Sequence, residues 1–277
     1  MADNNVVFDE LSKIESLGYC LMLAILYVLV FYIWNVPYHR DHPSTIKLRC
    51  IRAIGFSIVA PIFIKYVSQT SPKGVPVQRW LGIHGENLNK AAVFPSLLIM
   101  ILFAGPLTMM CLAEELPLMK KFSPSFDLIN IRNLIIAPIT EEFIYRACMI
   151  PLLVPSFGLM GAIFICPLLF GVAHFHHAIE RLQGSKSNVL IVTFFQFSYT
   201  TLFGVYSAFI FVRTGHLIGS FISHSFCNYM GVPEFEQINN TKFPKVVAGM
   251  FVIGLVLFLC FLFPLTEPNM YNSIYFK

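Results

Sequence analysis

Charged side chains are scarce in this chain of 277 residues. They make up 12% of it, about half of the fraction that a soluble domain of this length carries. Hydrophobic residues make up 56%, and the mean hydropathy is +0.70. The net charge of +4 is small and scattered along the chain, which argues against a nucleic-acid partner. The composition therefore predicts a membrane protein.

Several motifs of hydrolases are also missing. There is no G-x-S-x-G motif, and no Ser or Cys has an obvious base beside it, which disfavours a covalent nucleophile. The absence of H-E-x-x-H weakens a zinc-protease interpretation, and no Gly-rich loop is present to bind phosphate. The seven cysteines contain no C-x-x-C pair, so neither a disulfide framework nor a zinc ribbon is predicted.

Long apolar segments are what the chain has instead. Runs of roughly 17 to 25 apolar residues predict transmembrane helices. We count eight, at residues 17–35, 51–68, 91–113, 131–154, 159–176, 189–212, 216–230 and 246–264. No internal repeat or long linker divides the chain. We therefore expect one domain over residues 1–277, an all-α polytopic membrane protein with about eight transmembrane helices around an intramembrane cavity.

The orientation follows from the basic residues. Eight crossings place both termini on one side of the membrane. The loops after the odd-numbered segments hold 11 Lys and Arg residues, and the other side holds 7. Because basic loops favour the cytosolic side, we expect the odd-numbered loops to be cytosolic.

Polar residues interrupt the fourth, fifth and seventh predicted helices, although an unpaired charge costs several kcal/mol in lipid. With Arg132, Arg181 and Glu234 as interface markers and 1.5 Å per residue, four of these polar residues lie roughly 9 to 15 Å below the cytosolic face. A similar depth on three separate helices favours a water-filled cavity open to the cytosol. The four residues are Glu141, His174, His224 and Asn228.

The two adjacent glutamates are predicted to differ in role. Glu142 and Arg146 are four residues apart on a helix, so they pair on one face and offset each other's burial. Glu141 projects about 100° away, toward another helix. A lone intramembrane His or Asn is more often a hydrogen-bonding contact between helices, but an adjacent Glu pair in lipid points to function.

These residue types suit hydrolysis of an amide or ester. A carboxylate and an imidazole at one cavity form a general base that activates water. A second His and an Asn amide, both on the seventh predicted helix, supply hydrogen-bond donors for a developing oxyanion. The same Glu, His and Asn side chains also suit a metal ion, so a metal-dependent hydrolase stays open.

Three short sequences contain these polar residues: EEFIYR at 141–146, FGVAH at 170–174 and HSFCNYMGVP at 224–233. In this order they resemble the EExxxR, FxxxH and HxxxN motifs of the type II CAAX prenyl endopeptidases, the Ras-converting enzymes, in their eukaryotic form. The resemblance spans about residues 130 to 235. Each motif alone is weak, whereas the ordered set is specific.

The resemblance implies an eight-helix protease of the endoplasmic reticulum membrane, with its active site facing the cytosol and no cofactor. Such an enzyme removes the aaX tripeptide from farnesylated or geranylgeranylated proteins that end in Cys-a-a-X, such as Ras-like small GTPases. By position, Glu141 and His174 activate the water. His224 and Asn228 hold the oxyanion. A site below the membrane surface suits this substrate, because its prenyl group partitions into lipid while its peptide must reach water.

In the same scheme Glu142 and Arg146 are supporting residues.

Two alternatives to a protease arise from the same residues. A membrane di-iron oxygenase, suggested by HFHH at 174–177, needs about eight clustered His residues. This chain has eight in total, and half lie in loops or far apart. A non-catalytic membrane scaffold is the remaining alternative, and it does not require a base and matched donors at one depth.

Overall fold

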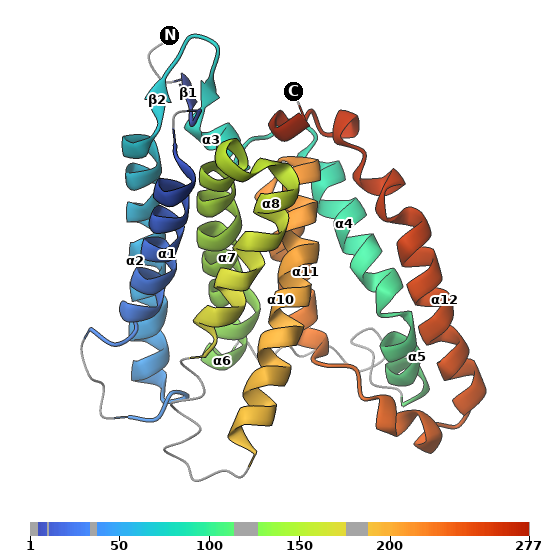
Figure 1. Ribbon diagram of the computed structural model, residues 1–277. Helices are drawn as coiled ribbons and strands as arrows, with labels where there is room; N and C mark the ends of the chain where they lie inside the picture. Colours follow the sequence, from blue (N-terminus) through green and yellow to red (C-terminus); the bar gives the residue numbers. More distant parts are fainter. Residues whose placement is uncertain (1–4, 10, 34–37, 114–126, 176–187, 277) are drawn as a thin grey trace.

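The structure, a computed structural model, describes residues 5–9, 11–33, 38–113, 127–175 and 188–276. His176, His177 and Arg181 of the sequence analysis lie outside the described residues. The long helices run side by side, and strand β1 lies at the same end of the molecule as the C-terminal helical turns (Figure 1). Two hydrogen bonds join these ends, because Trp80 Nε1 donates to the Val6 carbonyl and Tyr275 Oη donates to the Trp80 carbonyl.

The N-terminal half contains long helices and one small sheet. Strand β1 is central in the sheet and pairs antiparallel with β2 and β3. The elements are β1 (Asn5–Val7), α1 (Lys13–Leu29), α2 (Pro43–Val67), β2 (Gln69–Thr70), β3 (Val75–Pro76), α3 (Val77–Trp80), α4 (Leu88–Leu102) and α5 (Ala104–Leu112).

The C-terminal half is helical, with two π-helical segments in its first helix. The elements are α6 (Leu128–Ile131), π-helix η2 (Arg132–Ile136), α7 (Ala137–Glu142), π-helix η3 (Phe143–Cys148), α8 (Met149–Ala173), α10 (Val189–Thr214), α11 (Leu217–Met230), 3₁₀-helix η4 (Phe235–Asn240) and α12 (Pro244–Leu262). Three 3₁₀ turns follow, η5 (Pro264–Thr266), η6 (Pro268–Met270) and η7 (Ile274–Phe276).

The number of membrane crossings differs from the prediction. Within the described residues, four helical stretches are long and apolar enough to cross a membrane, or up to five with the bent pair α4–α5. The chain is therefore an all-α polytopic membrane protein, but the predicted count of eight is not confirmed. Helix α1 has 17 residues and α11 has 14, so both are short for a span.

The fourth predicted helix and most of the fifth lie within Leu128–Ala173 and are separated by a break at Gly158, as the sequence predicts. Gly158 has a φ of 69°, which a glycine adopts without steric cost. At this break the chain turns back, so that the part of α8 after Gly158 returns beside α7 (Figure 1).

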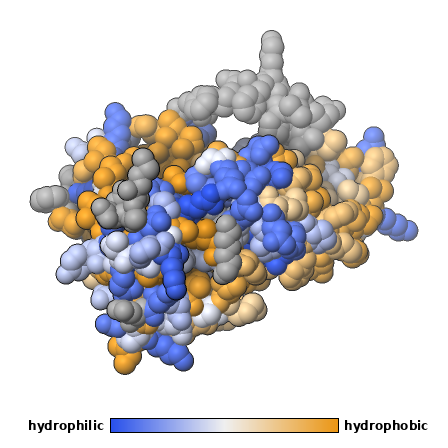
Figure 2. Space-filling view, turned by 90° about the horizontal axis from the view of Figure 1, so that it is seen from above, coloured by the Kyte–Doolittle hydropathy of each residue, from blue (hydrophilic) through white to orange (hydrophobic). Residues whose placement is uncertain are grey.

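Apolar side chains cover much of the helical surface. Leu190 is 85% exposed, Ile58 67% and Val252 62%, as expected for residues that face lipid. At the end that carries β1, hydrophilic residues gather toward the centre and hydrophobic residues lie around parts of the margin (Figure 2).

Helices α8 and α10 pack closely beneath the polar residues. A Cβ at Gly204 would lie 2.8 Å from Pro167 Cβ and 3.2 Å from Arg146 Nη2. Only a residue without a side chain allows this approach, as small residues do between membrane helices. Gly204 therefore brings α10 against the buried Arg146.

Candidate active site

A cavity of about 400 Å³ lies among α1, α2, η2, α7, α8 and α11. It reaches the exposed Arg40 and Asn228 at the end of the molecule opposite β1. The four catalytic residues predicted from the sequence belong to three helices, and in the structure all four line this cavity. They are Glu141, His174, His224 and Asn228.

Glu142 is fully buried and contacts three side chains. His224 Nδ1 lies 2.8 Å from its Oε1, and Arg146 Nε lies 3.2 Å from its Oε2. Ser207 on α10 donates a third contact to the same carboxylate. The i,i+4 spacing predicts only the pair with Arg146. The structure shows that Glu142 also fixes the His224 ring.

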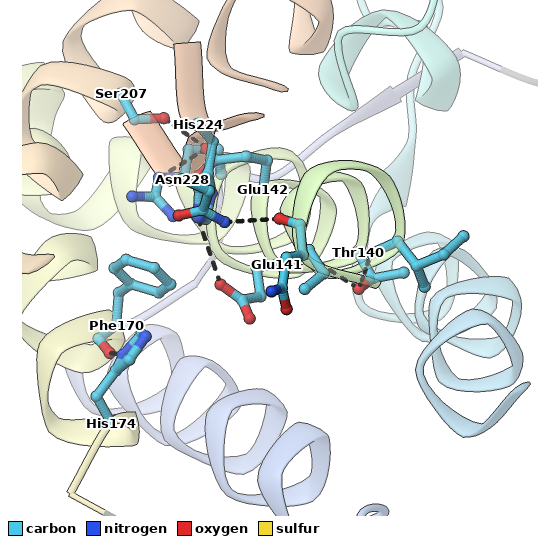
Figure 3. Close-up of polar contacts among 12 residues, drawn as sticks. Thr140, Glu141, Glu142, Phe170, His174, Ser207, His224 and Asn228 are labelled. Atoms are coloured by element: carbon cyan, nitrogen blue, oxygen red, sulfur yellow. Dashed lines mark hydrogen bonds and ion pairs between the residues drawn. The ribbon is translucent and has the colours of Figure 1, made fainter. Parts of the chain in front are cut away.

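His224 lies between the two glutamates (Figure 3). A carboxylate only accepts hydrogen bonds, so Nδ1 of His224 donates to Glu142. The other ring nitrogen, Nε2, is 3.8 Å from Glu141 Oε2. The side chain of Glu142 is fully buried, whereas that of Glu141 is 22% exposed. The adjacent carboxylates therefore occupy different environments, one beneath the imidazole and one on the cavity wall.

His174 follows the last residue of α8 and faces the same cavity (Figure 3). Its Nδ1 lies 2.8 Å from the Phe170 carbonyl, which can only accept, so Nδ1 carries the proton. In the neutral ring Nε2 then bears the lone pair. The Phe170 ring packs edge-on against His174 with the centroids 4.7 Å apart and is 1% exposed.

Asn228 and Ser225 attach α11 to the distorted helix that carries the glutamates. Pro138 has no N–H, so it cannot donate to the carbonyls four and five residues earlier, those of Leu134 and Asn133. Ser225 Oγ donates to the Leu134 carbonyl at 2.6 Å, and Asn228 Nδ2 donates to the Asn133 carbonyl at 2.9 Å. The π-helical turns and Pro138 thus provide the acceptors that position the donors of α11.

The Arg146 guanidinium is fully buried beside this site. Its contact with Glu142 is an ion pair, and among the described residues its N–H groups do not meet hydrogen-bond geometry. The guanidinium carbon lies 4.5 Å from the centre of the Phe170 ring, a favourable cation–π contact. The burial of Arg146 thus depends on Glu142 and on this ring.

Several residues of the site were not predicted from the sequence, among them Ser207, Ser225, Asn133 and Pro138. Serine is common in membrane helices, so Ser207 and Ser225 gave no distinctive signal. Pro138 within a predicted helix is the signal that was available, because a proline leaves carbonyls without donors.

Within the described ranges, no three His, Cys, Asp or Glu side chains are placed to hold one metal ion together. The site thus combines one partly exposed carboxylate, two imidazoles and one amide. These groups suit proton transfer to and from water and hydrogen bonding to a polarised carbonyl.

Comparison with known proteins points to one family. A sequence profile of Rce1-like type II CAAX prenyl endopeptidases matches residues 124–230. The chain is 43% identical to CAAX prenyl protease 2 of Homo sapiens over 92% of this chain and 82% of that protein. It is 37% identical to the CAAX prenyl protease 2 of Rattus norvegicus, over 92% of this chain and 81% of that protein. It is 32% identical to the CAAX prenyl protease 2 of Arabidopsis thaliana, over 96% of this chain and 94% of that protein. No solved structure matches the chain significantly.

Proposed function

The chain belongs to the type II CAAX prenyl endopeptidase family, and from this premise we propose that it cleaves prenylated proteins ending in Cys-a-a-X. The observation that carries the proposal is the cavity lined by Glu141, His174, His224 and Asn228. The reaction is hydrolysis of the peptide bond after the farnesylated or geranylgeranylated Cys, which releases the aaX tripeptide.

Water activation is assigned to Glu141 and His174. The Glu141 carboxylate and the His174 ring line one cavity, and Nδ1 of His174 is held by the Phe170 carbonyl. A water between these groups gives up a proton to them while its oxygen attacks the carbonyl carbon of the prenylated Cys. The same proton then passes to the amide nitrogen as the peptide bond breaks, which leaves a free amine and a carboxylic acid. The acid then loses its remaining proton to solvent and becomes a carboxylate.

Oxyanion stabilisation is assigned to His224 and Asn228. The proton on Nδ1 of His224 is used in the hydrogen bond to Glu142. For Nε2 to donate to an oxyanion as well, the ring must carry a proton on both nitrogens. The buried Glu142 carboxylate holds Nδ1 and so orients the ring. The Asn228 amide uses one N–H on the Asn133 carbonyl and has a second N–H for the substrate oxygen. Glu142 and Arg146 are therefore positioning residues.

The experiment that tests the function is cleavage of a farnesylated Cys-a-a-X peptide by the purified full chain, followed by mass spectrometry. We expect release of the intact tripeptide and little cleavage of the same peptide without the farnesyl group. A chelator added in a parallel reaction distinguishes the metal-dependent alternative, which predicts loss of activity. A bound but uncleaved peptide would support the scaffold alternative and contradict the proposal.

The oxyanion role leads to a kinetic prediction for Asn228→Ala. Donors aimed at an oxyanion act mainly in the transition state, so kcat should fall by about 10² to 10³ with little change in KM. Asn228 is exposed, and its truncation should leave the thermal unfolding temperature close to that of the wild type. Steady-state kinetics on the farnesylated peptide check this. A raised KM with kcat near the wild-type value would exclude the role.

We also propose that the cavity mouth faces the cytosol and that the membrane is that of the endoplasmic reticulum. The mouth lies on the side predicted to carry 11 of the basic residues. Prenylated substrates such as Ras-like small GTPases would reach the site from that side, with the prenyl group in the bilayer. Cleavage of a farnesylated Ras-like GTPase by sealed microsomes, without added detergent, tests both the side and the substrate.

A glycosylation sequon gives an independent prediction for the orientation. Asn239-Asn240-Thr241 lies between α11 and α12, on the side of the cavity mouth (Figure 1). A cytosolic loop does not meet the luminal transferase, so we expect no glycosylation at Asn239 in cells. A sequon appended after Lys277, on the opposite side, should be glycosylated and serves as the control. A glycosidase-sensitive mass shift at Asn239 would invert the orientation.

A further inference from the structure

Three arginines line the catalytic cavity toward its mouth: Arg40, Arg49 and Arg132. They come from the segment before α2, from α2 itself and from the start of η2. Among the described residues that line the cavity, the only carboxylate is that of Glu141. The cavity is therefore electrically polarised, with a carboxylate at its catalytic end and guanidinium groups toward its mouth.

Two of these arginines are held in place by Asp41. Arg132 Nη1 donates to Asp41 Oδ1 at 2.8 Å and to the Arg40 carbonyl at 3.2 Å. Arg40 Nε lies 3.8 Å from the same Asp41 oxygen. The hydrogen bond from Arg132 holds the pKa of Asp41 below its usual range. Asp41 thus stays ionised and joins the segment before α2 to η2, which orders the mouth.

The dimensions of the cavity match the part of the substrate that is released. Glu141 is nine residues from Arg132, or about 13 Å along a helix. An extended tripeptide spans about 10 Å. A substrate whose scissile carbonyl meets the catalytic residues therefore places its C-terminal carboxylate near the level of the arginines. Every Cys-a-a-X tail carries this carboxylate, whichever residue occupies X.

We infer that Arg40, Arg49 and Arg132 bind the C-terminal α-carboxylate of the substrate and so fix cleavage three residues from the chain end. The inference rests on the proposed function and assigns a specificity site within the same cavity. Guanidinium groups suit this ligand because they bind carboxylates with paired, charge-assisted hydrogen bonds. Glu141 would repel the same carboxylate from the catalytic end, which disfavours the reversed orientation of the peptide.

The test compares two farnesylated peptides that differ only at the C-terminus, one with a free carboxylate and one with an amide. We expect the wild type to cleave the carboxylate peptide with a kcat/KM about 10- to 100-fold higher than that of the amide, chiefly through KM. Arg49→Gln should lower kcat/KM for the carboxylate peptide and leave the amide peptide unchanged, so the discrimination collapses. Arg49→Lys should recover part of it.

Lys47→Gln is the matched control, because Lys47 is an exposed cation two residues earlier on α2 and does not line the cavity. It should keep the full discrimination. Arg40→Gln provides a second variant at an exposed position, should Arg49→Gln fold poorly. Equal cleavage of both peptides by the wild type would overturn the inference while supporting the proposed function.

The competing explanation is that these arginines bind anionic lipid headgroups at the membrane surface. In that case Arg49→Gln and Arg40→Gln would change cleavage of both peptides by the same factor, and this outcome overturns the inference. Cleavage of neither peptide by the wild type would instead refute the proposed function on which the inference rests. The comparison therefore separates failure of the carboxylate site from failure of the enzyme assignment.

Discussion

Replacing Glu141 by Gln is expected to lower kcat for the farnesylated peptide by about 10² to 10⁴, the effect of losing a general base. The substitution keeps the size of the side chain and removes only its ability to take a proton. Glu141 is partly exposed, and its ion-pair distance to His224 Nε2 is a long 3.8 Å. The fold should therefore tolerate the change. Cleavage kinetics and thermal unfolding of the purified variant measure the two effects separately.

A matched carboxylate away from the cavity provides the control for this prediction. Glu236 is exposed on η4, and Glu236→Gln should leave both cleavage and stability unchanged. Activity of Glu141→Gln within a few-fold of the wild type would exclude Glu141 as the base. A loss of activity accompanied by a large loss of stability would instead indicate a structural role for Glu141.

The sequence was most informative where one helix or one motif carries the information. The spacing of Glu142 and Arg146 predicts an ion pair, and the structure places the two groups 3.2 Å apart. The same helical geometry separates Glu141 from that pair. Apolar runs identified the membrane helices, and the break at Gly158 falls between the fourth and fifth predicted helices. The number of spans was not confirmed, because α1 and α11 are short for a span and α4–α5 is a bent pair.

The sequence was least informative about contacts between helices. Glu142 and His224 are 82 residues apart, and no local pattern indicates which nitrogen of His224 meets which carboxylate. The spacing rules used for prediction assume regular α-helices, whereas π-helical turns precede and follow α7. Those turns, together with Pro138, determine which carbonyls accept from Ser225 and Asn228. The contacts of these residues across helices therefore could not be predicted from their spacing along one helix.

The largest stability effect is expected for Arg146→Ala. This substitution leaves the fully buried Glu142 carboxylate without its guanidinium, and breaking such a buried pair costs about 3 to 5 kcal/mol. The Phe170 ring also loses its cation–π partner. The thermal unfolding temperature of this variant, measured in detergent, should be much lower than that of the wild type. Arg79→Ala, which breaks a partly exposed pair with Glu86, should cost about 1 kcal/mol or less and serves as the control.

A double variant separates the two roles of Glu142. Glu142→Gln combined with Arg146→Met removes both buried charges and keeps similar volumes, so it should recover much of the stability that Arg146→Ala loses. It should not recover cleavage, because His224 then lacks the carboxylate that holds its Nδ1 and orients its ring. If the double variant were both stable and active, Glu142 would be no more than a counter-ion for Arg146. If Arg146→Ala alone were as stable as the wild type, the buried pair would not support the fold. Stable but inactive protein is the outcome expected of a carboxylate that positions a catalytic histidine.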